Sequence, residues 1–168
     1  MFKIFLGIIF LSIAVQAQTK QPCSTQESRQ FDFWIGDWDA EWMTKDGVRK
    51  SGSNQVINLF NGCVIEENFN GEPGNQLKGK SFSVYDAKEK IWKQTWVDNG
   101  GGYLDFKGGF NEGKMILTRS TNDKNGAPVH QRMVYYNISK NEFDWDWEIS
   151  RDNGNTWELK WRIHYSRK

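Results

Sequence analysis

The chain has 168 residues, of which 38% are hydrophobic and 15% are aromatic, and its 22 Lys and Arg against 21 Asp and Glu give a net charge of +1. This length predicts one domain. The aromatic content excludes a disordered chain, and three Pro with 16 Gly exclude a collagen-like or low-complexity one. Because the balanced charge shows no basic excess or stripe, a nucleic-acid partner is not expected.

The first 17 residues have the pattern of a secretory signal peptide. Lys3 supplies the positive charge, residues 4–15 form a short apolar run, and Ala17 ends a cleavage site. The alternative is a membrane anchor, but the run is too short, because a spanning helix needs about 20 apolar residues. We therefore expect cleavage after Ala17, no membrane span in the mature chain, and export to the periplasm or the exterior.

Residues 18–30 are interpreted as an N-terminal segment that precedes a domain of residues 31–168. Ser24 and Glu27 fit a capping box, which predicts a helical turn near 24–30. The segment also holds Cys23, and Cys63 is the second cysteine of the chain. Export would permit a disulfide between them, and the alternative is two free thiols in a reducing compartment. We predict the Cys23–Cys63 disulfide, and the absence of a Cys/His zinc spacing predicts no metal site.

Past residue 33 the apolar residues recur with a period of two, which is the period of a half-buried strand. Trp157, Leu159, Trp161, Ile163 and Tyr165, for example, alternate with charged and polar residues. Turn signals, Asp-Gly and Asn-Gly among them, separate the runs. The pattern predicts about ten strands, near 34–44, 52–60, 63–70, 78–86, 90–98, 101–110, 113–121, 129–138, 142–150 and 156–166.

Ten consecutive hairpin-linked strands predict an all-β, antiparallel, up-and-down β-barrel, because closing the sheet removes its exposed edges. A competing signal comes from Trp34, Trp38 and Trp42, whose spacing of four would place them on one helix face. Gly36 and the alternating acidic residues of this stretch favour a strand instead.

The string FDFWIGDWD at residues 31–39 places a Gly36-x-Trp38 motif at the start of the first predicted strand. Here the chain resembles the calycin superfamily of lipocalins and fatty-acid-binding proteins, in which the Trp of such a motif closes one end of the barrel. The longer string is similar to the opening of a family of uncharacterised, mostly bacterial, lipocalin-like secreted proteins. Other matching pieces are Gly62-Cys63 with Glu67, the stretch 92–98 and the stretch 161–167.

This resemblance covers residues 31–168 and implies a barrel with an interior pocket, but no reaction. It also implies that a late basic residue packs against Trp38. Arg162 and Arg167 are the candidates, and Arg167 is favoured because Arg162 faces away from the apolar side of its strand. Ten strands fit the fatty-acid-binding or nitrobindin-like branch better than the eight-stranded one. A haem bound through His164, as in nitrobindin-like proteins, is disfavoured by strand parity, so no cofactor is predicted.

The stretch SRDNGNTW at residues 150–157 matches the Asp-box pattern Ser-x-Asp-x-Gly-x-Thr-Trp. The favoured interpretation is a hairpin turn in which Asp152 accepts backbone N–H bonds and Gly154 supplies a positive φ. The alternative is a sugar-processing enzyme, because Asp-boxes repeat around the propellers of sialidases.

Strand parity also predicts polar groups inside the barrel. Glu67 shares its strand face with apolar residues, and Arg132 is placed in the same way on a later strand. A pair between them is either an internal scaffold or a polar anchor for a ligand, since a buried charge is costly unless it is paired. The predicted wall of the ligand cavity consists of Trp38, Trp42, Glu67, Gln94, Trp96, Asp98, Arg132 and Trp147.

Three functions remain open from the sequence. The leading hypothesis is a secreted barrel that binds a small, partly apolar or aromatic molecule in its interior. The second is an isomerase or hydrolase on the same barrel, with Glu67 or Asp98 as general base. The third is a structural barrel filled by its own aromatic side chains, since small barrels are barely wide enough for them. The sequence assigns no catalytic residue.

Overall fold

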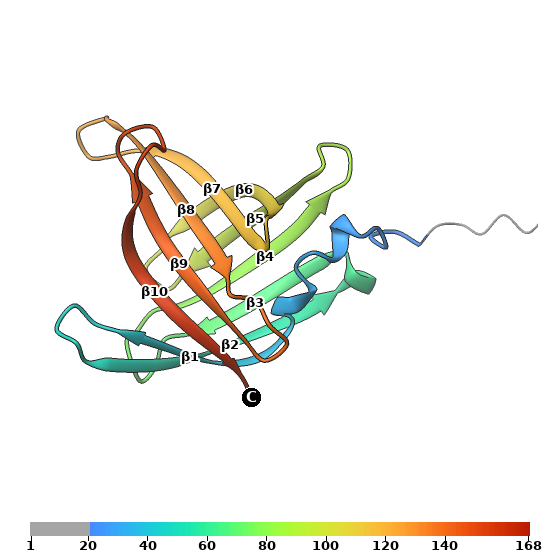
Figure 1. The fold of residues 1–168 in the computed structure, drawn as a ribbon, viewed down its shortest axis with the longest axis horizontal. Coiled ribbons are helices and arrows are strands. Elements are labelled where there is room, and N and C mark those ends of the chain that lie inside the picture. Colours follow the sequence, from blue (N-terminus) through green and yellow to red (C-terminus); the bar gives the residue numbers. More distant parts are fainter. Residues whose placement is uncertain (1–20) are drawn as a thin grey trace, which may run out of the picture.

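The computed structural model describes residues 21–168, so the predicted signal peptide at 1–17 lies outside the described residues. Ten antiparallel strands close into one barrel in which each strand pairs with its sequence neighbours and β1 pairs with β10 (Figure 1). The predicted all-β up-and-down barrel and its ten strands are confirmed. The elements are η1 (Glu27–Arg29), η2 (Asp32–Trp34), β1 (Gly36–Met43), β2 (Arg49–Leu59), η3 (Phe60–Gly62), β3 (Val64–Asn70), β4 (Lys78–Asp86), β5 (Ile91–Asp98), β6 (Tyr103–Asn111), β7 (Lys114–Asn122), β8 (Pro128–Tyr136), β9 (Glu142–Ser150) and β10 (Glu158–Arg167).

The helical pieces are short 3-10 turns. The predicted turn near 24–30 is found as η1, but the capping box is wrong: the hydroxyl of Ser24 donates to the carbonyl of Gln21, and the N-cap residue of η1 is Gln26. The turns η2 and η3 were not expected. Within residues 21–168 no helix combines the length and the apolarity that a membrane crossing would need.

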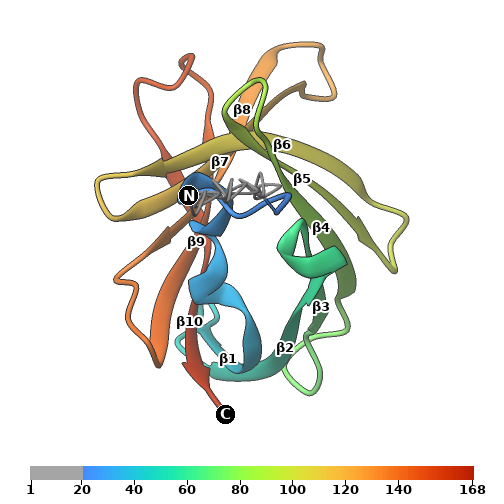
Figure 2. The same ribbon diagram turned by 90° about the vertical axis from the view of Figure 1, so that its right-hand side faces the viewer.

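The N-terminal segment closes one end of the barrel, as Figure 2 shows for the blue part of the chain. Phe31, Trp34 and Trp38, which we call the plug, are at most 1% exposed. The indole Nε1 of Trp38 donates to the carbonyl of Trp34 at 2.8 Å, and the ring of Trp38 packs edge-on against Phe143 at 4.9 Å between centroids. The start of strand β1 is therefore anchored in the buried aromatic plug.

Arg167 holds the plug from the other end of the chain. Its guanidinium lies 4.1 Å from the ring centroid of Trp38, and it donates to the carbonyls of Phe33, Ile35 and Lys140. A Cβ at Gly36, whose φ is +142°, would come within 2.1 Å of this guanidinium. The predicted packing of Arg167 against Trp38 is confirmed, and the glycine of the Gly-x-Trp motif leaves room for it.

A bulge interrupts the pairing of β10 with β9 between Leu159 and Trp161. Trp161 pairs with Trp147, so both point inward, whereas Leu159 pairs with Glu148 and points outward, where it is 44% exposed. The prediction that Trp157 and Leu159 share the inward face of Trp161 is therefore wrong. One extra residue in a strand reverses the side on which every earlier side chain lies.

The disulfide Cys23–Cys63 is present, with 5.1 Å between the two Cα atoms, and it ties the segment before the plug to the start of β3. The prediction of this bridge is confirmed. Such bridges are typical of proteins that fold in an oxidising compartment outside the cytoplasm.

Candidate functional site

A cavity of about 280 Å³ lies inside the barrel, above the plug. Trp34 of the plug forms its floor, and Leu77 and Asp98 belong to the loop end of the barrel opposite the plug. Several inward-facing side chains near that end are only partly buried, so the cavity is reached by solvent there. Its wall consists of Trp34, Glu67, Phe69, Leu77, Trp96, Asp98, Leu104, Phe106, Met133, Tyr135, Trp145, Trp147, Trp161, Ile163 and Tyr165.

Four of the eight residues predicted for the cavity wall line it: Glu67, Trp96, Asp98 and Trp147. They come from β3, β5 and β9, whose alternation has the predicted register. Room for the indole of Trp96 comes from Gly79 on β4, where a Cβ would lie 2.1 Å from that ring.

Three predicted residues are buried but belong to the packing around the cavity. Trp38 lies in the plug, beneath the floor. Trp42 packs edge-on against Trp161 at 5.4 Å between centroids. Gln94 is 4% exposed and donates to the hydroxyl of Ser83 at 2.8 Å.

The predicted position of Arg132 is wrong. In β8 the residues that line the cavity are Met133 and Tyr135, so Arg132 lies on the outer face. There its Nε bonds a carboxylate oxygen of Glu148, and its guanidinium lies 4.0 Å from the ring centroid of Trp157. The predicted ion pair between Glu67 and Arg132 does not exist.

Glu67 is the polar centre of the cavity and is 7% exposed. Its Oε1 accepts a hydrogen bond from Nδ2 of Asn54, and its Oε2 accepts one from the hydroxyl of Ser81, both at 2.7 Å. Burial raises the pKa of Glu67 from 4.5 to about 7, while these two hydrogen bonds lower the pKa by less. Near neutral pH the carboxyl therefore exchanges readily between its neutral and charged forms.

Asp98 lies at the loop end of the same cavity, and its pKa is shifted in the opposite direction from that of Glu67. Its carboxylate accepts hydrogen bonds from the backbone N–H groups of Gly100 and Gly102, and from Nε1 of Trp96. The hydrogen bond from Gly102 and the one from Trp96 hold the pKa of Asp98 below its usual value. Asp98 is thus an ionised residue that orders the β5–β6 loop and positions the Trp96 ring.

Four polar residues of the site were missed by the sequence analysis. Asn54 and Ser81, which bind Glu67, alternate with more exposed residues along β2 and β4, so parity contained a signal for them. Tyr135 and Tyr165 line the cavity, and burial, with the nearby charge of Glu67, raises the pKa of each phenol well above its usual value. Both phenols therefore stay neutral throughout the physiological range.

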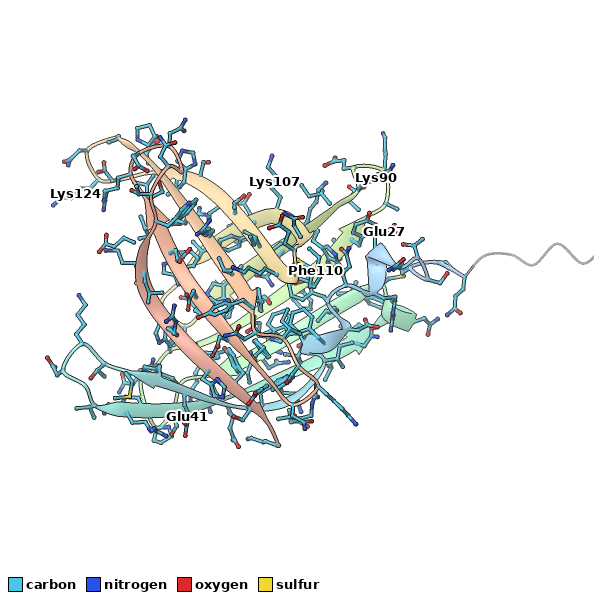
Figure 3. All side chains as sticks on the ribbon, viewed as in Figure 1. Glu27, Glu41, Lys90, Lys107, Phe110 and Lys124 are labelled. Atoms are coloured by element: carbon cyan, nitrogen blue, oxygen red, sulfur yellow. A yellow bond between two sulfur atoms is a disulfide. The ribbon has the colours of Figure 1, made fainter. Side chains whose placement is uncertain are left out.

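The charged side chains in the cavity wall are both acidic. Among the lining residues of the described chain there is no Lys, Arg or His. Arg119 follows Met115 and Leu117 on the inward face of β7 but is not among the lining residues; its guanidinium lies 5.9 Å from the ring centroid of Phe106, and it donates to Gln131. Charged side chains such as Lys107 and Lys124 lie on the outside of the molecule (Figure 3).

The remaining sequence motifs lie outside the cavity. The Asp-box is a hairpin turn, in which Asp152 accepts the N–H of Thr156 and the indole of Trp157 donates to the carbonyl of Gly154. His164 is half-exposed and bonds Asp144 on the outer face, as its parity predicted. No group of three or more His, Cys, Asp or Glu within residues 21–168 is arranged to hold a metal ion.

The protein is a closed ten-stranded antiparallel barrel around an aromatic cavity whose wall holds the carboxyl groups of Glu67 and Asp98. No protein-family model matches the chain, and comparison with curated proteins finds no match. Among solved structures, a redesigned β-barrel matches with a TM-score of 0.45 and 12% identity, over 83% of this chain and 96% of that one. EF1p2_mFAP2b, solved with DFHBI bound, matches with a TM-score of 0.44 and 11% identity, over 85% of this chain and all of that one.

Proposed function

We propose that this barrel binds a small, partly apolar or aromatic molecule in the cavity above the plug. The observation that carries the proposal is the cavity itself, an aromatic chamber of about 280 Å³ with a buried carboxyl in its wall. Ligand sites are concave and mostly apolar, with a few convergent polar groups, and they usually measure about 300 to 1,000 Å³. A chamber just below this range fits a molecule of one ring and a short substituent.

The proposal also covers the export of the protein and its membership of a protein family. Cleavage after Ala17, an N-terminal segment at 18–30 and a barrel domain at 31–168 would deliver the protein to the periplasm or the exterior, in agreement with its disulfide. Membership of the lipocalin-like secreted proteins is supported by the Gly36-x-Trp38 motif and by the stacking of Arg167 on Trp38.

Blocking the cavity tests the binding function. Leu104 lines the cavity, so Leu104→Trp fills it, whereas Leu159→Trp adds the same ring to the outer face. We expect indole to bind the wild type and Leu159→Trp with the negative heat-capacity change of apolar burial, and to bind Leu104→Trp much more weakly. Titration calorimetry measures this, and equal binding to all three proteins would place the indole outside the cavity.

A second candidate function is proton transfer, with Glu67 as the general base of an isomerase or hydrolase. It is favoured by one observation, the buried Glu67 carboxyl whose pKa of about 7 lies near the optimum for a general base at neutral pH. Asp98 is a poorer base because its lone pairs are engaged and its pKa is lowered. A ligand that binds and is returned unchanged by the wild-type protein would leave binding as the function.

A further inference from the structure

We propose that the cavity selects a small organic cation, an arylalkylamine whose ammonium group pairs with Glu67 while its ring lies among the tryptophans. This inference rests on the proposed function, that the cavity holds a ligand, and it adds the chemical class of that ligand.

The charged side chains that line the chamber all have the same sign. Its charged side chains, Glu67 and Asp98, are both acidic, and no basic side chain lines it. Arg132 is engaged by Glu148 on the outer face, and Arg119, on the inward face of β7 beside Phe106, donates to Gln131 and lies 4.0 Å from Asp105. The two charges that line this low-dielectric space attract a cation and repel a carboxylate ligand.

The carboxylate of Glu67 has unused hydrogen-bonding capacity. Each carboxylate oxygen accepts one hydrogen bond, from Asn54 or Ser81, and can accept a second. Oδ1 of Asn54, beside this carboxylate, is a buried acceptor whose near neighbour is the phenol of Tyr165. The polar end of the cavity is therefore rich in acceptors, and an ammonium group supplies donors and the missing countercharge.

Aromatic side chains surround Glu67 in the cavity wall. Tyr135 and Tyr165 lie near enough to Glu67 for its charge to act on their phenols, and Trp145 and Trp161 pack edge-to-face in the same wall. The faces of such rings attract cations, most strongly where water is excluded. The same rings offer apolar contact to an aryl group, so one small molecule uses both properties.

Three ligands of one shape and different charge test the inference: phenethylamine, 2-phenylethanol and 3-phenylpropanoate. Titration calorimetry of the wild-type protein is made in mildly alkaline buffer, where Glu67 and the amine are both charged. We expect the amine to bind at least about tenfold more tightly than the alcohol, and the carboxylate to bind most weakly. Equal binding of amine and alcohol overturns the inference and leaves the proposed function standing, whereas no binding by any of the three overturns both.

Matched variants test whether the preference for the amine depends on the carboxylate of Glu67. Glu67→Gln removes the charge and keeps the shape, while Glu66→Gln removes a charge from the neighbouring outward residue, which is paired with Lys80. We expect Glu67→Gln to abolish the preference for the amine over the alcohol, and Glu66→Gln to retain it. Should Glu67→Gln fail to fold, Glu67→Asp keeps the charge and is expected to keep the preference for the amine. A preference that survives in folded Glu67→Gln, or is lost in folded Glu67→Asp, overturns the inference.

Discussion

At the scale of single residues, Glu67 links the stability of the barrel to pH. Its pKa is about 7 in the folded protein against an ordinary value of 4.5. Below pH 4.5 Glu67 is neutral in both the folded and the unfolded states. As the pH rises towards 7, the unfolded chain ionises first, and the folded protein loses stability until its own carboxyl ionises.

We therefore expect Glu67→Gln to become more stable relative to the wild type as the pH rises. The difference in free energy of unfolding should shift by about 3 kcal/mol between mildly acidic and mildly alkaline pH. Tyr135 and Tyr165, which face Glu67, stay neutral in this range and do not contribute. Urea unfolding of both proteins at several pH values measures the shift, and a difference independent of pH would contradict it.

Arg167 is the second residue with a distinct role, because its guanidinium both stacks on Trp38 and donates to three carbonyls. We expect Arg167→Ala to lower the free energy of unfolding by about 2–4 kcal/mol through the lost hydrogen bonds and stacking. Arg167→Lys should recover less than half of this, because an ammonium cannot reproduce a planar fork of donors. Full recovery by Lys in urea unfolding would show that only the charge matters.

At the scale of elements, the β9–β10 hairpin depends on one buried hydroxyl. Ser150 is 2% exposed; its Oγ donates to Asp152 and accepts the N–H of Gly154. We expect Ser150→Ala to lower the free energy of unfolding by about 1–2 kcal/mol, because that N–H loses its partner. The exposed Ser166 of β10 supplies the control, since Ser166→Ala should change stability by less than about 0.5 kcal/mol.

In two strands, β8 and β10, the sequence analysis assigned some side chains to the wrong face of the sheet, and in both the pattern was ambiguous for a physical reason. Strand β8 has four consecutive apolar residues, 133–136, so a period of two identifies no inward face there. The bulge in β10 is defined by its pairing with β9, which no local pattern reveals. Where polar and apolar residues alternate without interruption, as over residues 143–147 of β9, the predicted inward face was correct.

The error in the inward face of β8 changed the predicted site, because it put Arg132 inside the barrel and left Tyr135 out. Arg132 was paired with Glu67 because a buried acid was expected to have a buried base. In the structure the buried carboxyl of Glu67 is instead hydrogen-bonded by the neutral donors Asn54 and Ser81, and burial raises its pKa. Since β2 and β4 also carry other short polar residues, such as Ser53, Asn58 and Ser83, nothing in the sequence distinguished Asn54 and Ser81 as the partners of Glu67.

At the scale of the whole molecule, the Cys23–Cys63 disulfide joins the N-terminal segment to the barrel across 40 residues of sequence. A loop of this length is expected to contribute about 4 kcal/mol by restricting the unfolded chain. We expect the double variant Cys23→Ser, Cys63→Ser to lose about 2–4 kcal/mol of unfolding free energy. The wild type in strong reductant should match the variant, and the variant itself should be unaffected by reductant. A wild type that loses no stability on reduction would contradict this.

Because β1 pairs with β10, the barrel can close only when both ends of the domain are available. Trp38 pairs with Arg167, and the plug beneath it depends on the same arginine. A chain that emerges from a ribosome or a translocation channel in order can therefore build nine strands as a growing curved sheet, but it cannot seal the sheet until β10 has left the channel. Until β10 pairs with β1, the sheet remains open. The nascent chain then exposes to solvent the aromatic surface that faces the interior of the folded protein.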